Sequence, residues 1–209
     1  MGRYFREACC PSAEAAGIAA KNGASRVELC ESLEIGGVTP SQKMMEQVLK
    51  ENPGLCVNVL VRPRGGNFIF SEDEIQTMLK DIRLCKSLGV NGVVIGALRP
   101  DGSVDMDCMR RLIAEARPLS ITFHRAFDEC SDVRDCLEDV IALGCDRLLT
   151  SGHEKNALEG RFTIAELVKQ AAGRIIIMAG CGVRPSNIDI IAESTKAEEY
   201  HSSTLLGWD

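Results

Sequence analysis

Two glutamate-x-cysteine motifs are the residues most suited to holding a metal ion. They are Glu7-Ala-Cys9 and Glu28-Leu-Cys30, and each ends a short apolar segment. Because successive side chains of a strand point to opposite faces, the acid and the thiol of each motif share one face. Thiolates are soft ligands that select Cu(I) over hard ions. The motifs therefore predict a Cu(I) site at Cys9 and Cys30, with packing of both thiols as small apolar residues as the alternative.

Arginines and glycines at the ends of other apolar segments suggest an anion site. Arg62-Pro-Arg64-Gly-Gly66 offers forked donors on a backbone that the glycines leave open to a ligand. Glycines and hydroxyls late in the chain suit phosphate, which backbone N–H groups can bind. The expected ligand-binding residues are Arg62, Arg64, Arg125, Ser151, Gly180, Gly182, His201 and Ser202. Tight turns and structural ion pairs would explain the same residues without a ligand.

A histidine and two acids could supply acid/base chemistry. His124 ends an apolar segment in His124-Arg125-Ala-Phe-Asp128, and Asp128 or a buried glutamate such as Glu28 could hold its ring. His124, Glu28 and Asp128 are therefore the candidate catalytic residues. We expect His124 to titrate near neutral pH if the protein is an enzyme.

Short β-branched segments alternate with longer segments of helical period. The expected strands are 4–8, 26–30, 56–61, 92–95, 120–123, 147–149, 174–178 and 198–201. Between them lie amphipathic helices, and Ser71 with Glu74 predicts a capping box at the start of one of them. Three helix-to-strand junctions repeat one pattern, as in Leu88-Gly-Val-Asn-Gly-Val and Leu143-Gly-Cys-Asp-Arg-Leu. Eight β-then-α units predict a (β/α)8 barrel, in which chemistry lies at the carboxyl ends of the strands.

The length places all eight units in a single domain over residues 1–209. Such barrels typically need about 250 residues, and only eight residues follow the last expected strand. We therefore expect the eighth helix to be missing or supplied otherwise. An apolar strip would then lie bare between the first and seventh helices, covered by a partner chain or by a rearrangement of the last strand.

Composition and charge exclude several classes of protein. The net charge is -6 and no long basic run occurs, which argues against nucleic acid as a partner. No secretory signal is expected at the first residues, and no apolar stretch approaches the 18 residues of a membrane span. Ten cysteines without any Cys-x-x-Cys spacing suggest reduced thiols in the cytoplasm rather than zinc sites or disulfides.

Seven ordered motifs resemble the copper homeostasis protein CutC family. They are Glu7-Ala-Cys9, Arg26-Val-Glu-Leu-Cys30, Gly36-Gly-Val-Thr-Pro-Ser41, Arg62-Pro-Arg-Gly-Gly66, His124-Arg-Ala-Phe-Asp128, Leu149-Thr-Ser-Gly152 and Glu199-Tyr-His-Ser202. The resemblance implies a cytoplasmic, self-associating (β/α)8 barrel that handles copper through strand-end cysteines, here Cys9 and Cys30. Members of the family usually have glycine where this chain has Cys181, and they continue for several tens of residues further.

Two functions compete, and a homodimer or higher homo-oligomer is expected for either. The first is a cytosolic protein that binds Cu(I) through Cys9 and Cys30. The alternative is a TIM-barrel enzyme that acts on a small phosphate or carboxylate by acid/base chemistry. A scaffold with a polar structural interior is a third interpretation. The arginines favour the enzyme and the paired thiols favour the copper protein, so whether the chain is an enzyme stays open.

Overall fold

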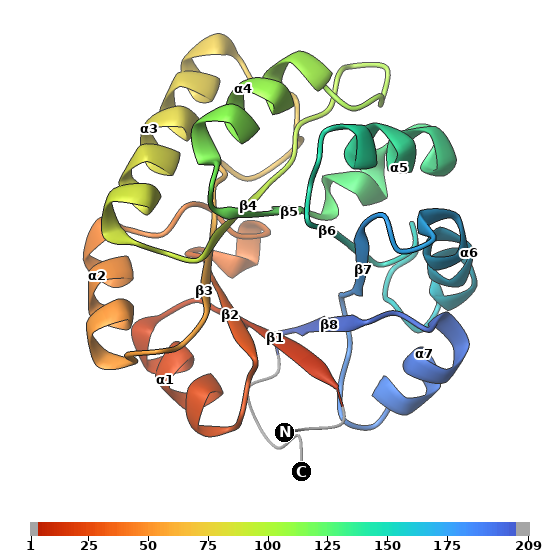
Figure 1. The fold of residues 1–209 in the computed structure, drawn as a ribbon, viewed down its shortest axis with the longest axis horizontal. Helices are drawn as coiled ribbons and strands as arrows, with labels where there is room; N and C mark the ends of the chain where they lie inside the picture. The colour runs from red at the N-terminus through yellow and green to blue at the C-terminus, as the bar shows by residue number, and fades with distance from the viewer. Residues whose placement is uncertain (1–3, 204–209) are drawn as a thin grey trace.

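Eight parallel strands form a closed barrel in the computed structural model, which describes residues 4–203 (Figure 1). Each strand pairs with the next along the chain, and β8 returns to β1. The strands are β1 (Phe5–Cys10), β2 (Arg26–Leu29), β3 (Val57–Leu60), β4 (Gly92–Ile95), β5 (Ser120–Phe123), β6 (Arg147–Thr150), β7 (Ile176–Ala179) and β8 (Glu199–Ser202). The prediction of a (β/α)8 barrel is thus confirmed.

Seven α-helices surround the barrel within residues 4–203 (Figure 1). They are α1 (Ala13–Lys21), α2 (Gln42–Glu51), α3 (Glu72–Leu88), α4 (Met106–Ala116), α5 (Val133–Ala142), α6 (Arg161–Ala171) and α7 (Ile188–Thr195). Short 3-10 helices, η1 (Leu33–Ile35) and η2 (Arg125–Glu129), follow β2 and β5. None of the helices in this part of the chain is long and apolar enough to cross a membrane.

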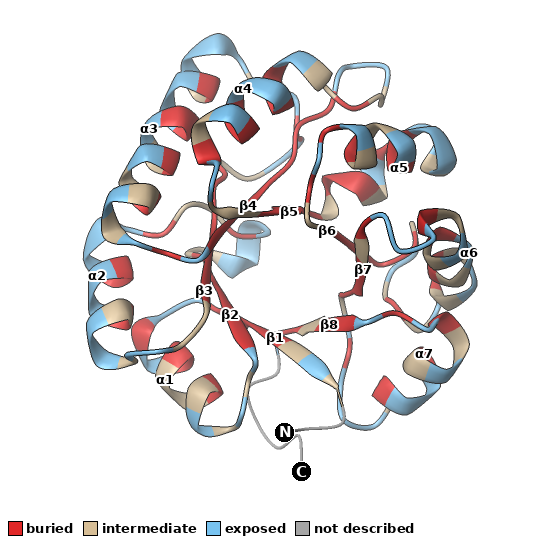
Figure 2. Cartoon of the chain, viewed as in Figure 1, coloured by how far each residue is buried: buried red, intermediate tan, exposed pale blue. Residues whose placement is uncertain are grey.

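The helix boundaries follow the signals in the sequence. Ser71 accepts from the Glu74 backbone while the Glu74 side chain accepts from Ser71, which is the predicted capping box of α3. Gly89 ends that helix at a φ of +78°, in the left-handed region that glycine enters without strain. The helices turn their buried residues toward the barrel and their exposed residues outward (Figure 2).

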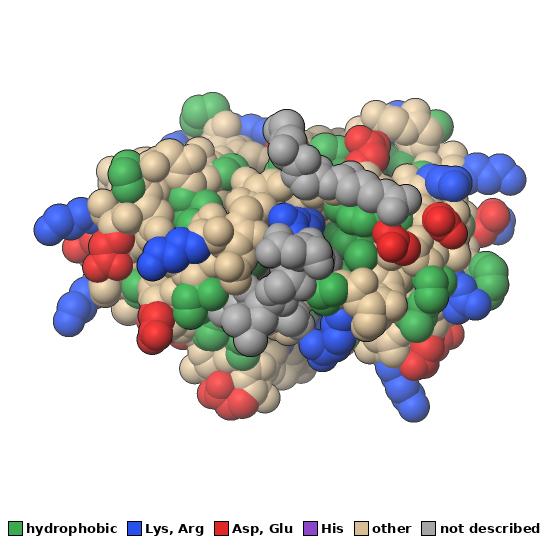
Figure 3. Space-filling model, turned by 90° about the horizontal axis from the view of Figure 1, so that it is seen from below, with side chains coloured by type: hydrophobic (Ala, Val, Ile, Leu, Met, Phe, Trp, Pro, Cys, Tyr) green, Lys and Arg blue, Asp and Glu red, His purple; other side chains and the backbone are tan. Residues whose placement is uncertain are grey.

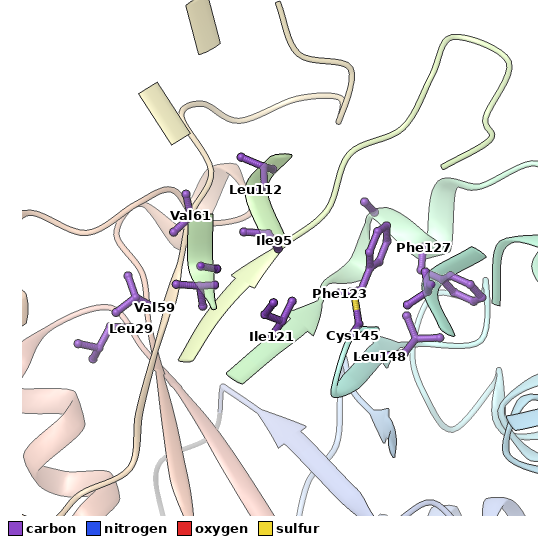
Figure 4. Packing of buried hydrophobic residues seen from close by; sticks show 14 of the residues in the cluster. Leu29, Val59, Val61, Ile95, Leu112, Ile121, Phe123, Phe127, Cys145 and Leu148 are labelled. Atoms are coloured by element: carbon purple, nitrogen blue, oxygen red, sulfur yellow. The ribbon is translucent and has the colours of Figure 1, made fainter. Parts of the chain in front are cut away.

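The main hydrophobic core lies between the strands and the helices (Figure 4). Leu29, Val59, Ile121 and Leu148 point out of the barrel into this layer and are fully buried. The alternate residues point inward, where a small apolar cluster forms from Cys9, Cys30, Leu60 and Val94. Strand parity therefore assigns Glu7, Cys9 and Glu28 to the barrel interior, as the sequence predicted.

Buried ion pairs close the amino-terminal end of the barrel interior. Arg26 donates to both Glu7 and Glu199, and Arg147 donates to Glu199 with an Nε–Oε2 distance of 3.0 Å. Every side chain in this group, which we call the barrel floor, is at most 10% exposed. Charges so deeply buried are tolerated only because they are paired and hydrogen-bonded.

Several strand boundaries differ from the sequence prediction by one or two residues, and two of these differences are the largest. β1 runs two residues past its expected end, to Cys10, and β7 begins two residues late, at Ile176. Parallel strands in a barrel are staggered, so Cys9 pairs in register with Glu28 rather than with Cys30. The two acids are therefore not level with each other, and Glu28 lies beside a thiol.

The expectation of a missing eighth helix and a bare strip falls on residues 204–209, outside the described residues. Figure 1 shows α1 and α7 as the helices that flank β1 and β8. Figure 3 looks onto this side, where apolar and charged side chains are mixed around the grey trace. Phe5 of β1 and Ile190 of α7 are among the exposed large apolar residues of the chain.

Candidate functional site

A cavity of about 710 Å³ opens at the carboxyl ends of the strands. This is where chemistry lies in (β/α)8 barrels, and the volume suits a small molecule. All three histidines line it, together with residues that the sequence had singled out: Cys9, Glu28, Cys30, Arg62, Arg125, Asp128 and Gly182. The barrel topology therefore brings most of the candidate residues to one place.

The thiols of Cys9 and Cys30 meet on one wall of this cavity. Their Sγ atoms lie 3.5 Å apart, and both residues are buried. Their hydrogen bond, burial and the nearby Glu28 raise the pKa of Cys9 well above its usual value. In contrast, Cys10 points into the helix layer, where burial raises its pKa to about 12. Parity thus separates Cys10 from the pair, as expected.

A carboxylate and an imidazole complete this wall. His201 Nε2 lies 2.8 Å from the Glu28 carboxylate. Burial alone would lower the pKa of His201, but the charge and hydrogen bond of Glu28 and the charge of Glu7 together outweigh it, and the pKa is raised. Ligand atoms of Cys9, Glu28 and His201 all lie within 4.8 Å of one another. The sequence placed His201 among anion ligands, and only the return of β8 to β1 shows that it neighbours a thiol.

A second part of the cavity lining is built from Arg62, Phe68 and His124. Arg62 follows β3, and its Nη1 donates to the carbonyl oxygen of Gly37 at 3.1 Å. The aromatic ring of Phe68 lies beneath the Arg62 guanidinium, 4.6 Å from its carbon to the ring centre. His124 follows β5 and packs against the same ring, with the two ring centres 4.9 Å apart.

His124 does not have the partners that an acid/base role was expected to give it. Its Nδ1 accepts from the Ala126 N–H at 3.2 Å, and Asp128 bonds elsewhere. Burial, with the charge of Arg62 adding to it, lowers the pKa of His124 to about 3. The prediction that His124 titrates near neutral pH is therefore wrong, because a buried ring beside a cation does not take up a proton.

Asp128 organises the loops around the cavity instead. It accepts from the Thr150 and Ser151 hydroxyls and from the backbone N–H groups of Ser151 and His153. Arg125 Nε donates to it at 2.8 Å. Asp128, Arg125 and Ser151 thus satisfy one another and join η2 to the loop after β6. Their arrangement is that of a structural bracket rather than of free ligand-binding groups.

The remaining predicted ligand-binding residues lie outside the cavity lining. Arg64 turns away and pairs with Glu74, its Nε 2.5 Å from Oε1. Gly180 gives room to neighbouring side chains, since a Cβ there would meet Leu149. The Ser202 hydroxyl donates to the Val183 carbonyl oxygen at 2.7 Å. The sequence could not separate Arg62 from Arg64, because only their side-chain directions differ.

Comparison with known proteins assigns the chain to a family. The family model described as "CutC family" matches residues 4–206. The chain belongs to the CutC family. A family protein CutC of Parabacteroides distasonis is 52% identical over 94% of this chain and 81% of its own length. The human "Copper homeostasis protein cutC homolog" is 45% identical over 96% of this chain and 73% of its own length.

Solved structures agree with this assignment. The structure described as the putative copper homeostasis protein CutC from Streptococcus agalactiae is 32% identical, with a TM-score of 0.92. It is matched over 97% of this chain and 100% of its own chain. An aldolase is similar at a TM-score of 0.70 with 16% identity, which shows the barrel fold alone.

The residue that stands where the CutC family usually has glycine has glycine-like geometry. Cys181 follows β7 with a φ of +71° and lines the cavity. Its Sγ donates to the Lys155 carbonyl oxygen at 3.2 Å. Among residues 4–203, the close group of potential ligands around Cys9 contains Glu28 and His201 but not Cys181.

Proposed function

We propose that this CutC-family chain serves copper homeostasis in the cytoplasm by binding Cu(I) between Cys9 and Cys30. The observation that carries the proposal is the 3.5 Å approach of the two Sγ atoms inside an open cavity. Two thiolates form a soft donor set, which prefers Cu(I) to Mg²⁺ or Ca²⁺. The family names, which refer to copper homeostasis, support the same ion. Cu(I) is here the cargo of the protein.

The surroundings of the thiols set how readily the ion binds. The Cys9 thiol is protonated in the free protein, since its hydrogen bond with Cys30, its burial and the neighbouring Glu28 raise its pKa. Binding must therefore release protons, and the affinity for Cu(I) should rise with pH. The arriving positive charge compensates the thiolates, while His201 keeps the charge of Glu28 paired. Glu28 and His201 also lie close enough to Cys9 to offer a third donor.

A competition titration with a chromophoric Cu(I) chelator under reducing conditions tests the proposal. We expect the native chain to hold one Cu(I) per chain, and Cys9→Ala and Cys30→Ala each to lose it. Loss of one of two thiolates leaves a single soft ligand, so the affinity should drop by at least about 100-fold, equivalent to about 2.7 kcal/mol.

Cys10→Ala is the matched control. It removes the neighbouring thiol of β1, which points into the helix layer instead of the cavity. Equal affinity of the native chain and all three variants would show that Cu(I) binds elsewhere. A native chain that binds no more tightly than a simple thiol would show that the pair is only a packing contact.

A further inference from the structure

Two other side chains of the cavity lining keep a buried donor without an acceptor. Arg62 and His124 are each 5% exposed, and both line the cavity. Within the described residues, neither Arg62 Nε nor His124 Nε2 has a hydrogen-bond partner. Leaving a buried donor unsatisfied is destabilising. Two such donors packed on the same Phe68 ring indicate a place for an acceptor group from outside the chain.

The hydrogen bonding of His124 determines which nitrogen carries its proton. Because Nδ1 accepts from the Ala126 N–H, Nδ1 presents a lone pair and the proton lies on Nε2. Burial and the charge of Arg62 lower the pKa of His124 to about 3, so the ring stays neutral at physiological pH. His124 is therefore a fixed N–H donor rather than a group that exchanges protons.

Arg62 brings a positive charge that no carboxylate within residues 4–203 neutralises by direct contact. The carbonyl oxygens of Gly37 and Gly66 accept its Nη protons, and both are neutral groups. The other arginine lining the cavity, Arg125, has a carboxylate 2.8 Å away. The charge of Glu129, another residue of the lining, acts on Arg62 without contacting it, and an anion in direct contact would compensate the buried charge more fully.

We propose that Arg62 and His124 bind the carboxylate of a small organic acid. The proposal does not rest on the copper site and concerns other residues of the same cavity. Two donors and one positive charge match a monoanion. A phosphate dianion needs more donors, and the acids Glu129 and Glu154 also line the cavity and would repel a second negative charge. Leu33 and Ile35 also line the cavity, and the Ile35 carbonyl oxygen accepts from Arg62. Their side chains suit an apolar body on the ligand.

Calorimetric titration of the copper-free, reduced protein with butyrate tests the proposal. Butyramide, of similar shape but neutral, and inorganic phosphate are the comparison ligands. We expect butyrate to bind, and butyramide and phosphate to bind at least about 10-fold more weakly. Arg62→Gln should weaken butyrate binding at least 10-fold. The matched control Arg64→Gln should leave it unchanged, because Arg64 lies outside the cavity and pairs with Glu74.

A measurement on the native chain does not depend on the folding of a variant. Nitrogen-15 NMR of the histidine rings should show His124 as the neutral Nε2–H form. Its Nε2 proton should move downfield when butyrate is added and stay in place when butyramide is added. Tighter binding of phosphate than of butyrate, equal effects of Arg62→Gln and Arg64→Gln, or an unmoved His124 proton at tens of millimolar butyrate would each overturn the proposal.

Discussion

At the scale of single residues, position in the barrel matters more than residue type. Parity along β1 and β2 was enough to predict that Cys9 and Cys30 share the interior, and their thiols do meet. The role of His124 could not be predicted, because its pKa depends on burial and on Arg62, which is distant in sequence. The same is true of His201, whose neighbour Glu28 is reached only through the closure of the barrel.

The buried neutral state of His124 predicts a specific pH dependence of stability. Its folded pKa of about 3 lies below the usual 6.5, so the unfolded chain binds more protons between these values. The free energy of unfolding should therefore be fully retained above pH 6.5 and fall as pH drops toward 3, by up to about 1.4 kcal/mol per pH unit. When urea unfolding is measured at several pH values in this range, the free energy of unfolding of His124→Gln should depend less steeply on pH than that of the native chain. Parallel curves for the native chain and the variant from pH 4 to 6.5 would contradict the assignment.

Replacing Cys181 by glycine should stabilise the folded protein. A non-glycine residue at a φ of +71° costs about 1–2 kcal/mol, more than the weak thiol hydrogen bond to Lys155 returns. We expect Cys181→Gly to raise the free energy of unfolding by about 0.5–1 kcal/mol, measured by urea denaturation. Cys56→Gly, at a position outside the left-handed region, should change stability in the opposite direction.

At the scale of elements, local signals in the sequence predicted which strands and helices exist, and in what order, better than they predicted where each one begins and ends. The capping box of α3 and the glycine that ends this helix could be predicted because each depends on residues that are close together in the sequence. The strand ends shifted because pairing partners determine where a ladder stops, as in the extension of β1 to Cys10 beside Leu29 of β2. The stagger that brings Glu28 beside Cys9 is likewise a property of pairing rather than of either strand.

Gly160, in the loop before α6, has no room for a side chain. A Cβ on Gly160 would overlap the carbonyl oxygen of Ser151, whose backbone Asp128 holds in place. Gly160→Ala should lower the free energy of unfolding by about 3 kcal/mol. The control is Gly17→Ala inside α1, where the nearest atom to a Cβ is 3.9 Å away. It should stabilise by up to about 1 kcal/mol because alanine favours the helix. Equal thermal shifts in the two variants would contradict this account.

At the scale of the whole molecule, the alternation of strands and helices was sufficient to predict the closed barrel. Each β-then-α unit has an apolar outer strand face and an amphipathic helix, and only closure buries all of them together. The sequence showed that the interior would be polar but not which charges would pair. Arg26 reaches Glu199 from the other end of the chain, a contact that only the return of β8 to β1 allows.

The barrel floor predicts a large effect of a single substitution. Arg26→Met leaves Glu7 and Glu199 without their shared partner in a buried interior. We expect the free energy of unfolding to fall by about 3–5 kcal/mol, measured by calorimetry or urea denaturation. Arg174→Met removes an exposed pair with Glu138 and should leave stability almost unchanged. A comparable loss of stability in both variants would show that the ion pairs of the barrel floor contribute no more to stability than the exposed pair does.

The ion pairs of the barrel floor also determine from which end a ligand can reach the interior of the barrel. Paired charges occupy the amino-terminal end of the barrel interior, and among the described residues the cavity lies at the other end, at the carboxyl ends of the strands. A ligand that enters this cavity would therefore also leave through the same opening. The loops that Asp128 joins lie around that opening. If Cu(I) is the cargo, a protein that delivers the ion and a protein that receives it would both have to approach this one face of the barrel.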